Sequence, residues 1–534
     1  MKLSVFDRLV AAVDPARGMQ RLRVRAAMEA LRAMPSLGAL SEENAPAASA
    51  PAAGRWWRPM ARDAKSDTLR QLGLQRGQSR ELARTSPIAV GAINTNVDRV
   101  VGTGLALSAQ PHRGVLGWSV EQALEWKQIV QSEFSLFADS HESDFAQEQN
   151  FYEQQGVVLR GTLESGDIFT LMPDGERTAT QPYALRIQLL EADRVGNPLG
   201  QLDTSLMAGG VRRAVTGAAD AYFVYDQHPG GYLAGGSLYA GQWVERLGRS
   251  GRRRILHHFR KLRPDQPRGL PYLAPIVDCI KQIARYTEAE IMAAVISAYF
   301  TVFIETPDGG GTAPIFGAND ADAGGIGNEI GLGMGAVVGL APGEKPHTSN
   351  PGRPNPNFEP FILAVIKQMG MALGLPYELL VKQFNASYSA SKAALLDAWV
   401  YFRSVRTWLA RSFCQPVYET WLAEAVAIGR VPAPGFFADP LLRWAYTRAV
   451  WPGDSMGSIN PKDEVAAYVA AIEARLMTRE RAEWELWGTD FNETLDAKQA
   501  EQDRLKDADL LPTPKPGAAA PQPGSAPANP EDQP

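Results

Sequence analysis

The sequence predicts an α+β fold in which a mixed first half precedes a helix-rich second half. Short apolar runs in the first half, such as GDIFTLM and DAYFVYD, are separated by PDGE and by Gly/Pro clusters, a pattern typical of strands and turns. From Pro271 onward the apolar residues extend in long stretches with few helix breakers, which favours helices. With 534 residues, 45% of them hydrophobic and 21% charged, the chain is long enough for three or four structural units.

Capping patterns locate two helices in the first half. Ser86 is a good N-cap residue, Pro87 suits the first helical position, and Gly102 lies just past the last apolar turn. Ser119 and Gln122 have the spacing of a capping box, in which each side chain binds the other residue's backbone N–H. We therefore expect one helix to begin at Pro87 and another just after Ser119.

The second half is expected to hold two long apolar helices with a breaker-rich stretch between them. Residues 271–304 offer a helix of about 34 residues, which would be about 50 Å long at 1.5 Å per residue. Residues 305–357 are dense in glycine and proline, and the apolar run FEPFILAVIKQMGMALG follows. A single helix of about 50 Å exceeds what most globular domains need.

A small polar segment, QFNASYSASK, then leads into an aromatic-rich helix that continues to about Ile428. Pro416 lies inside this helix. Its missing N–H and its ring, which collides with the preceding turn, predict a helix kink there. Residues 459–505 predict two charged helices, the first capped by Asn460 and the second by Thr478.

Charge and composition limit the classes of function. The net charge of −5 argues against a chain that coats itself with nucleic acid through an overall positive field. Two cysteines, Cys279 and Cys414, lie 135 positions apart in apolar sequence and predict no disulfide framework, in keeping with a reducing, intracellular site of assembly. The longest uncharged run, Ile291 to Ile304, falls short of the roughly 20 residues that span a membrane, so no membrane contact is expected.

Motifs for catalysis are sparse. Ser389 and Lys392 form an S-x-x-K pair of the kind found in serine acylases, but no S-D-N or K-T-G partner motif exists. The alternative for this pair is structural, with Ser389 capping the helix that follows. The six histidines do not show H-E-x-x-H spacing, and no G-x-x-x-x-G-K-[ST] phosphate loop occurs. We expect no enzymatic activity, no cofactor and no metal site.

A basic run lies between Arg249 and Gly269. Its cationic residues of interest are Arg252, Arg253, Arg254, Arg260, Lys261 and Arg263. Such a cluster could neutralise phosphates of a nucleic acid, or it could form a solvated face or a salt-bridged surface between subunits. The sequence leaves both interpretations open.

Several separated blocks together resemble the lambda family of phage portal proteins over residues 55–505. The matching blocks, in order, are RWWRP, SRELARTSPIAVGAINTNVDRVVGTGL, YALRIQLLEADRVGNP, ILHHFRKLRPDQPRGLPYLAPI, FNASYSASKAALLDAWVYF and NPKDEVAAYVAAIEARLMTRERAEWELWG. No single block is specific for this family, but six blocks in the same order are.

The resemblance implies a ring-forming portal fold, usually of twelve subunits, at one vertex of the capsid. Its parts would be a partly disordered N-terminal arm (1–54), a mixed α/β wing (55–270), a first stem helix (271–304), a clip insertion (305–357), a second stem helix (358–379), a tunnel loop (380–390), a kinked long helix with the wing return (391–458), a helical crown (459–505) and a disordered tail (506–534).

The resemblance also implies a function, a channel through which double-stranded DNA is packaged and later ejected. The tunnel-loop residues that would face the DNA are Lys382, Gln383, Phe384, Asn385, Ser387, Tyr388 and Ser389. Small polar side chains suit this task, because tight contacts to phosphates or bases would hinder a sliding duplex.

Further partners follow from the same resemblance. They are the terminase large subunit as the separate packaging motor, the major capsid protein or scaffold, and a head-completion protein. The protein would be part of the virion, assembled in the cytoplasm of a host bacterium. Two alternatives remain: a nucleic-acid-binding protein that uses the basic run without forming a ring, and a serine hydrolase using Ser389 and Lys392.

Overall fold

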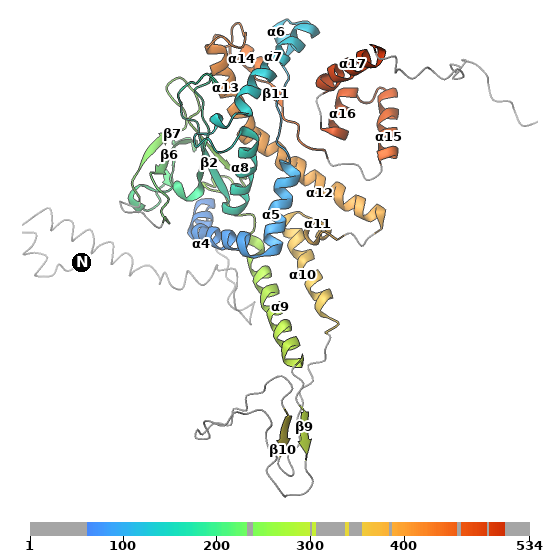
Figure 1. The fold of residues 1–534 in the computed structure, drawn as a ribbon. Helices are drawn as coiled ribbons and strands as arrows, with labels where there is room; N and C mark the ends of the chain where they lie inside the picture. Colours follow the sequence, from blue (N-terminus) through green and yellow to red (C-terminus); the bar gives the residue numbers. More distant parts are fainter. Residues whose placement is uncertain are drawn as a thin grey trace, which may run out of the picture.

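The computed structural model describes residues 61–231, 239–298, 302–305, 337–340, 355–383, 387–455, 461–488 and 491–507 (Figure 1). The expected N-terminal arm and most of the expected clip and C-terminal tail lie outside these ranges.

Helices make up most of the described chain. They are α4 (Ala64–Thr85), α5 (Pro87–Val100), α6 (Arg113–Leu116), α7 (Val120–Ala138), α8 (Phe151–Ser165), α9 (Val277–Ala298), α10 (Phe358–Leu373), α11 (Tyr377–Val381), α12 (Tyr388–Leu409), α13 (Gln415–Ala427), α14 (Pro440–Tyr446), α15 (Pro461–Glu473), α16 (Arg479–Trp487) and α17 (Phe491–Asp507). Short 3-10 turns are η1 (His141–Ser143), η2 (Ala192–Arg194), η3 (Pro198–Gly200) and η4 (Ala274–Ile276).

The predicted caps of α5, α7 and α16 are confirmed. Ser86 accepts a hydrogen bond from the N–H of Ala89 with proline at the start of α5. Both reciprocal bonds of the Ser119–Gln122 capping box are present at α7. Thr478 accepts from the N–H of Arg481 at α16. Such caps satisfy N–H groups that the first helical turn leaves without partners.

The strands form four small sheets in the described residues. The strands are β1 (Ser108–Ala109), β2 (Asp167–Leu171), β3 (Gln188–Glu191), β4 (Met207–Ala208), β5 (Val211–Arg213), β6 (Ala219–Tyr225), β7 (Gly241–Glu245), β8 (Ile255–Phe259), β9 (Val302–Glu305), β10 (Val337–Leu340) and β11 (Ala449–Val450). Their orders are β3-β2-β8, β4-β5-β6-β7, β1-β11 and β10-β9. Only the β9–β10 pair is parallel.

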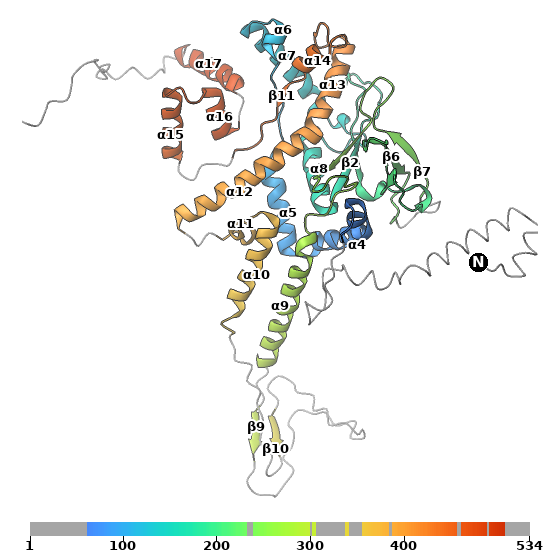
Figure 2. The same ribbon diagram turned by 180° about the vertical axis from the view of Figure 1, so that it is seen from behind.

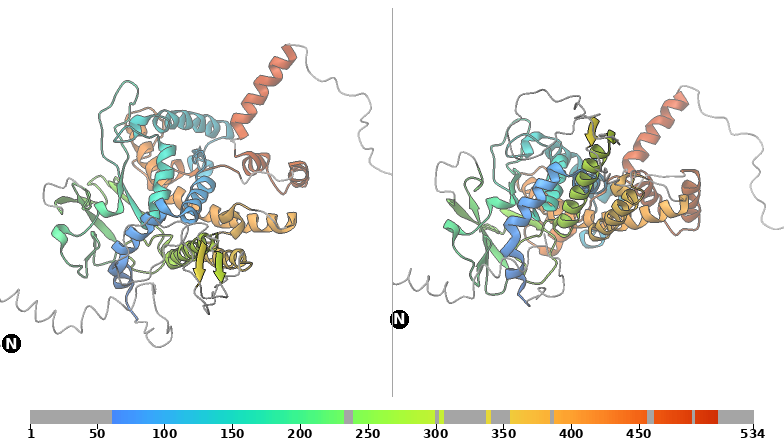
Figure 3. Two further views of the ribbon diagram at one scale, coloured as in Figure 1. Left: turned by 60° about the horizontal axis from the view of Figure 1, so that its bottom comes forward. Right: turned by 90° about the horizontal axis from the view of Figure 1, so that it is seen from below.

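Two apolar clusters fill the interior. The larger one joins α5, α7, α8, α10, α12 and α13 and contains an aromatic group in which Phe134 meets Trp421 edge-on at a centroid distance of 5.0 Å. The smaller one lies between the two larger sheets, around Phe169 and Tyr222. In Figure 3 the four-stranded sheet, in green, lies on one side of α4 and α5, and the start of α12 extends on the other.

The two long apolar segments form α9 and α10, which leave the body together toward β9 and β10 (Figure 1). The ring of Tyr286 on α9 packs on Phe358 and Phe361 of α10, at centroid distances of 5.5 and 4.9 Å. The first helix is shorter than expected: α9 covers Val277–Ala298, and residues 302–305 are a strand. β-Branched Val302 and Ile304 suit that strand better than a continued helix.

The C-terminal segment also differs from its prediction. Residues 461–507 form three helices rather than two, because α16 ends at Gly488, whose φ of +74° is left-handed. Glycine adopts that conformation without the steric cost that a side chain would bring. The expected cap Asn460 lies outside the described residues.

Candidate functional site

The expected tunnel loop lies between α11 and α12. α11 ends at Lys382, which has a left-handed φ of +52°, and the N–H of Gln383 donates to the carbonyl of Glu378 at 3.1 Å. Lys382, Gln383, Ser387 and Ser389 are exposed. Phe384 and Asn385 lie outside the described residues, as does the side chain of Tyr388. The described part of the loop is therefore polar and open to its surroundings.

The Ser389–Lys392 pair is not arranged for catalysis. Lys392 Nζ lies 3.1 Å from Glu464 Oε1 on α15, so its charge is paired with a carboxylate. The predicted helix cap is shifted: Ser387 accepts from the N–H of Ala390, and Ser389 lies inside the first turn of α12. Both serines can cap, but the helix begins at Tyr388, which leaves Ser387 in the capping position.

Pro416 follows a π-helical turn. α12 and α13 run as one rod across the molecule (Figure 2), interrupted only by the π turn Ala410–Cys414. Pro416 stands at the second residue of α13. Because proline cannot donate to the carbonyl of Ser412 and its ring would collide with it, a wider turn at this place is the expected accommodation. The kink itself stays a prediction.

Three arginines of the basic run form ion pairs with carboxylates of the same chain. Arg252 pairs with Asp174, and Arg263 pairs with Asp67 on α4. Arg253 Nη2 lies 3.3 Å from Glu419 Oε2 on α13. These contacts join the segments on either side of β8 to other parts of the chain, including α4 and α13, so they favour a structural role for this half of the run.

The other three cationic residues of the run, Arg254, Arg260 and Lys261, are exposed. The guanidinium of Arg260 lies over the ring of Tyr401 on α12 at 5.9 Å. The structure therefore divides the basic run and does not gather it into one cationic surface.

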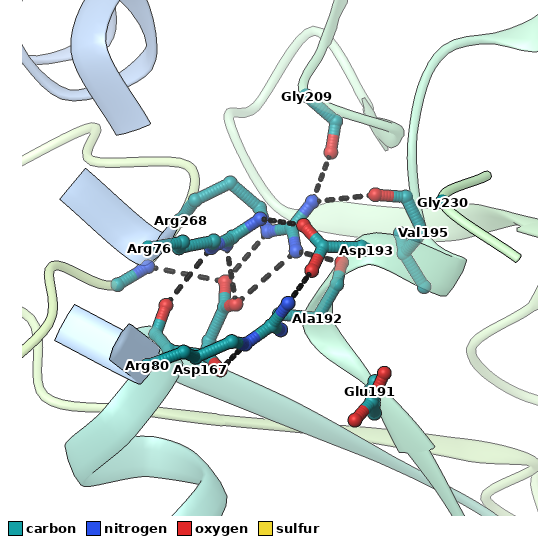
Figure 4. A network of polar contacts seen from close by, with 12 residues as sticks. Arg76, Arg80, Asp167, Glu191, Ala192, Asp193, Val195, Gly209, Gly230 and Arg268 are labelled. Carbon is teal, nitrogen blue, oxygen red and sulfur yellow. Dashed lines mark hydrogen bonds and ion pairs between the residues drawn. The ribbon is translucent and has the colours of Figure 1, made fainter. Parts of the chain in front are cut away.

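A buried charge network, which the sequence did not indicate, centres on Asp167 at the start of β2 (Figure 4). Arg76 on α4 donates to Oδ1 at 2.6 Å, and Arg268 donates to Oδ2 at 2.6 Å and to Oδ1 at 3.1 Å. His257 Nε2 lies 3.0 Å from Oδ2, and the N–H of Gly269 donates to the same oxygen at 3.1 Å. Asp167 therefore has partners on α4, on β8 and in the segment that leads to α9.

Arg268 and Asp193 have further partners in the network. Arg268 donates to the carbonyls of Ala192, Val195 and Gly209 at 2.6 to 2.8 Å. Arg76 and Arg80 both pair with Asp193. A buried charge is tolerated when it is paired and hydrogen-bonded, and Asp167, Arg76 and Arg268 meet that condition, whereas Nη2 of Arg80 is buried without a hydrogen-bond partner.

Electrostatics keep Asp167 ionised. Burial alone would raise the pKa of this carboxyl, but Arg268, Arg76 and His257 outweigh it and hold the pKa well below its ordinary range. Burial lowers the pKa of Arg76 to about 10, which leaves it charged at neutral pH. Burial also lowers the pKa of His257 to about 4, against the opposing effect of Asp167, so the imidazole is neutral.

A close backbone approach supports the network. Gly269 lies against Gly166, and a Cβ on Gly269 would stand 1.9 Å from the carbonyl oxygen of Gly166. Only glycine permits this approach, which brings the N–H of Gly269 onto Asp167.

The described residues contain no group of three or more His, Cys, Asp or Glu placed to hold a metal ion. Within those residues, none of the helices has the length and apolar character needed to cross a membrane.

Comparison with known proteins decides the family. The family described as "Phage portal protein, lambda family" matches residues 51–406, which is two thirds of the chain. The chain belongs to the lambda family of phage portal proteins. The portal protein of Escherichia phage N15 is 25% identical over 505 residues, covering 90% of this chain and 93% of that protein. Portal protein B of Escherichia phage lambda is 23% identical over 480 residues, covering 86% and 89%.

Chains in solved neck structures of a gene transfer agent particle also match this chain. A chain in the neck of the empty particle, computed with C6 symmetry, is 12% identical, with a TM-score of 0.39 and coverage of 76% of this chain and 92% of that chain. A chain in the neck of the native particle, computed with C12 symmetry, is 13% identical, with a TM-score of 0.37 and the same coverage.

Portal function and a place in the virion follow from family membership, and portal proteins are structural rather than catalytic. The resemblance expected from the sequence blocks is confirmed. The hydrolase and the ring-free nucleic-acid-binding alternatives are not favoured.

Sequence reasoning missed several helices of this portal-family chain, of which α4 and α8 are the longest. α8 carries a capping box, Asn150 with Glu153, that could have revealed it. α4 is capped by Asp63, whose side chain accepts from the N–H of Ser66. The buried network had no signal in the sequence, because Arg76, Asp167 and Arg268 lie about 100 positions apart.

Proposed function

We propose that the chain is one subunit of a homo-oligomeric ring, with twelve copies expected, that forms the DNA channel at one capsid vertex. The observation that carries this proposal is the family match over residues 51–406, supported by relatives that align over almost their whole length. In this role the ring conducts DNA during packaging and ejection.

The surfaces of α9 and α10 support assembly. Ile291, Met292 and Val295 on α9 and Phe361 and Met371 on α10 are exposed in the single chain. Uncovered apolar groups on paired helices are typical of surfaces that a partner buries. In a ring, the neighbouring copies would cover these faces, and the two helices would act as the stem.

The segment Lys382–Ser389 is proposed to line the channel as the tunnel loop. Its described residues are polar and exposed, and Lys382 would add one positive charge per subunit toward the DNA backbone. A single weak contact per subunit lets a duplex slide, whereas many phosphate contacts would hold it in place.

The remaining parts are proposed to follow the family plan. Residues 55–270 would form the wing, 305–357 the clip that receives the terminase large subunit, and 459–505 the crown. The ring would be assembled in the cytoplasm of the host bacterium, with the major capsid protein or scaffold and a head-completion protein as further partners. The family assignment and the order of the described elements support this plan.

Imaging tests the proposal directly. The purified full-length chain at micromolar concentration should give rings with a central hole in negative stain, and averaging should give their symmetry. Monomers alone, over a series of salt concentrations, would contradict it.

A further inference from the structure

Each subunit has two exposed faces that differ in charge, one on α14 and one on α7. α6, α7 and α14 gather at the end of the molecule away from the tips of α9 and α10 (Figure 1). The α14 face combines apolar and basic side chains, whereas the α7 face combines apolar and acidic ones. Their relation matters because a ring needs each subunit to present two different, complementary surfaces.

The α14 face consists of Phe437, Leu441, Trp444, Arg443 and Arg448. The three apolar side chains are 64%, 55% and 48% exposed. The guanidinium of Arg448 lies 5.2 Å from the ring centre of Trp444, and that of Arg443 lies 5.5 Å from the ring centre of Phe436. Neither arginine takes part in an ion pair with the described residues. The face therefore offers positive charge fixed beside an exposed aromatic ring.

The α7 face consists of Val120, Glu121, Leu124, Glu125 and Asp139. Val120 is 50% exposed and Leu124 39%. The exposed charged side chains of α7 and its C-cap are all acidic, although the exposed Arg113 of α6 acts electrostatically on Glu121. Glu121 and Glu125 are four residues apart, so they lie on one side of the helix about 6 Å from each other along its axis.

Each of the two faces lies away from the contact that joins α7 to α14. α7 packs against α14 through Trp126, whose ring lies 5.5 Å from that of Tyr446 and whose Nε1–H donates to the carbonyl of Pro432 at 2.8 Å. Glu125 and Leu124 lie about 100° and 160° around α7 from Trp126, and Trp444 lies about 160° around α14 from Tyr446, at 100° per residue. Both faces are therefore turned away from the contact that joins the helices, and the ring of Trp444 also lies 5.3 Å from that of His112, just before α6.

We propose that the α14 face of one subunit docks on the α7 face of the next copy in the ring. Apolar side chains would be buried at the centre of the contact, and Arg443 and Arg448 would meet Glu121 and Glu125 of the neighbour. A contact between different surfaces of identical chains repeats around an axis and closes when the rotation fits. Charge complementarity of this kind also sets the register of association. This proposal rests on the ring of the proposed function.

Charge exchange between the two faces provides the test. One variant carries Arg443→Glu and Arg448→Glu, and a second carries Glu121→Lys and Glu125→Lys. At low salt each variant alone should need at least a tenfold higher concentration for half-maximal ring formation, measured by sedimentation and native mass spectrometry. Their equimolar mixture should recover assembly, since each acidic face then meets a basic one, and mass spectrometry should show both variants alternating in even-numbered rings.

Controls separate this contact from folding and from the ring itself. Arg481→Glu reverses an exposed arginine on α16 and should leave assembly unchanged. Circular dichroism should show that all variants fold, with a slightly lower unfolding temperature for the variant that carries Glu121→Lys because Glu121 lies in the first turn of α7. If the wild-type chain forms rings and both variants form them equally well, or if the mixture fails to recover assembly, the docking proposal is wrong while the ring stands. If the wild-type chain forms no ring, the proposed function fails.

Discussion

Asp167 on β2 and Arg76 on α4 form a buried ion pair with an oxygen-to-nitrogen distance of 2.6 Å. The pair joins the first described helix to the sheet of the mixed half, although 91 residues separate the two in sequence. Arg268 adds a second cation from the segment that leads into α9. The network thus connects the sheet, α4 and the segment before α9 through one carboxylate.

Removing Arg76 should destabilise the chain strongly. In Arg76→Met the carboxylate of Asp167 stays buried with one cationic partner fewer, and breaking a buried pair typically costs about 3–5 kcal/mol. Urea unfolding at neutral pH measures the change in the free energy of unfolding. Arg481→Met, which breaks the exposed pair with Glu485, should cost less than about 1 kcal/mol. Equal losses in the two variants would contradict a structural role for the network.

Stability should fall on mild acidification because of two buried histidines. Burial lowers the pKa of His258 to about 3 and that of His257 to about 4 in the folded chain. The unfolded chain therefore binds protons first, starting near the ordinary histidine pKa of about 6.5. Between about pH 6.5 and 4 the folded state loses up to about 1.4 kcal/mol per pH unit for each histidine. Asp167 adds its own loss only below its ordinary pKa of about 3.9, since its folded pKa is depressed.

His258→Gln should halve that acid sensitivity. The variant can keep a hydrogen bond to Thr170 Oγ1, which lies 2.8 Å from His258 Nε2, but it takes up no proton on unfolding. Urea unfolding at about pH 7, 6 and 5 gives the slope of stability against pH, which should be about half as steep as in the parent chain. An unchanged slope would show that other groups account for the acid sensitivity.

Local patterns predicted the fold where the cause is local. The caps at Ser86, Ser119 and Thr478 depend on residues within one helical turn, and all three are confirmed. The end of α9 was misplaced because apolar residues continue from the helix into β9, so hydrophobicity alone does not mark the change. Ser387 and Ser389 are equivalent as caps in sequence, and only the position of the first turn distinguishes them.

Such local patterns could not predict contacts between segments that are distant in sequence. For Arg263 the sequence left a phosphate contact and a salt-bridged surface both open, and only the folded chain shows that it pairs with Asp67 on α4. The partners of Asp167 come from three separate elements, and no spacing in the sequence connects them. The channel residues stay predictions, because a single chain does not show which side chains face the centre of a ring.

Shortening the proposed tunnel loop should impair DNA packaging but not ring formation. Deleting residues 383–386 keeps Ser387, which caps α12, so the helix and the surfaces of α9 and α10 should be preserved. Rings are checked by electron microscopy, and packaged DNA per particle by nuclease-protected DNA. Lys382→Ala serves as the milder variant, since it removes only the expected phosphate contact. Normal DNA content in particles of the deletion variant would refute the tunnel-loop assignment.

Replacing Pro416 should change the π turn before it. In Pro416→Ala the restored N–H can donate to the carbonyl of Ser412, so the turn can close into a regular α-helix and straighten the rod. Closing the turn rotates α13 relative to α12 and displaces its buried Tyr418 and Trp421, so ring yield should fall. Ring yield is measured by sedimentation, and the helix by electron cryomicroscopy.

The matched control for Pro416 is Pro87→Ala. Pro87 stands at the first position of α5, where a proline removes no helical hydrogen bond, so this variant should assemble normally. A Pro416→Ala ring that forms in normal yield with the π turn retained would mean that the surrounding aromatic core, rather than the proline, holds the turn open. Normal yield with a regular helix would mean that the π turn is dispensable for assembly.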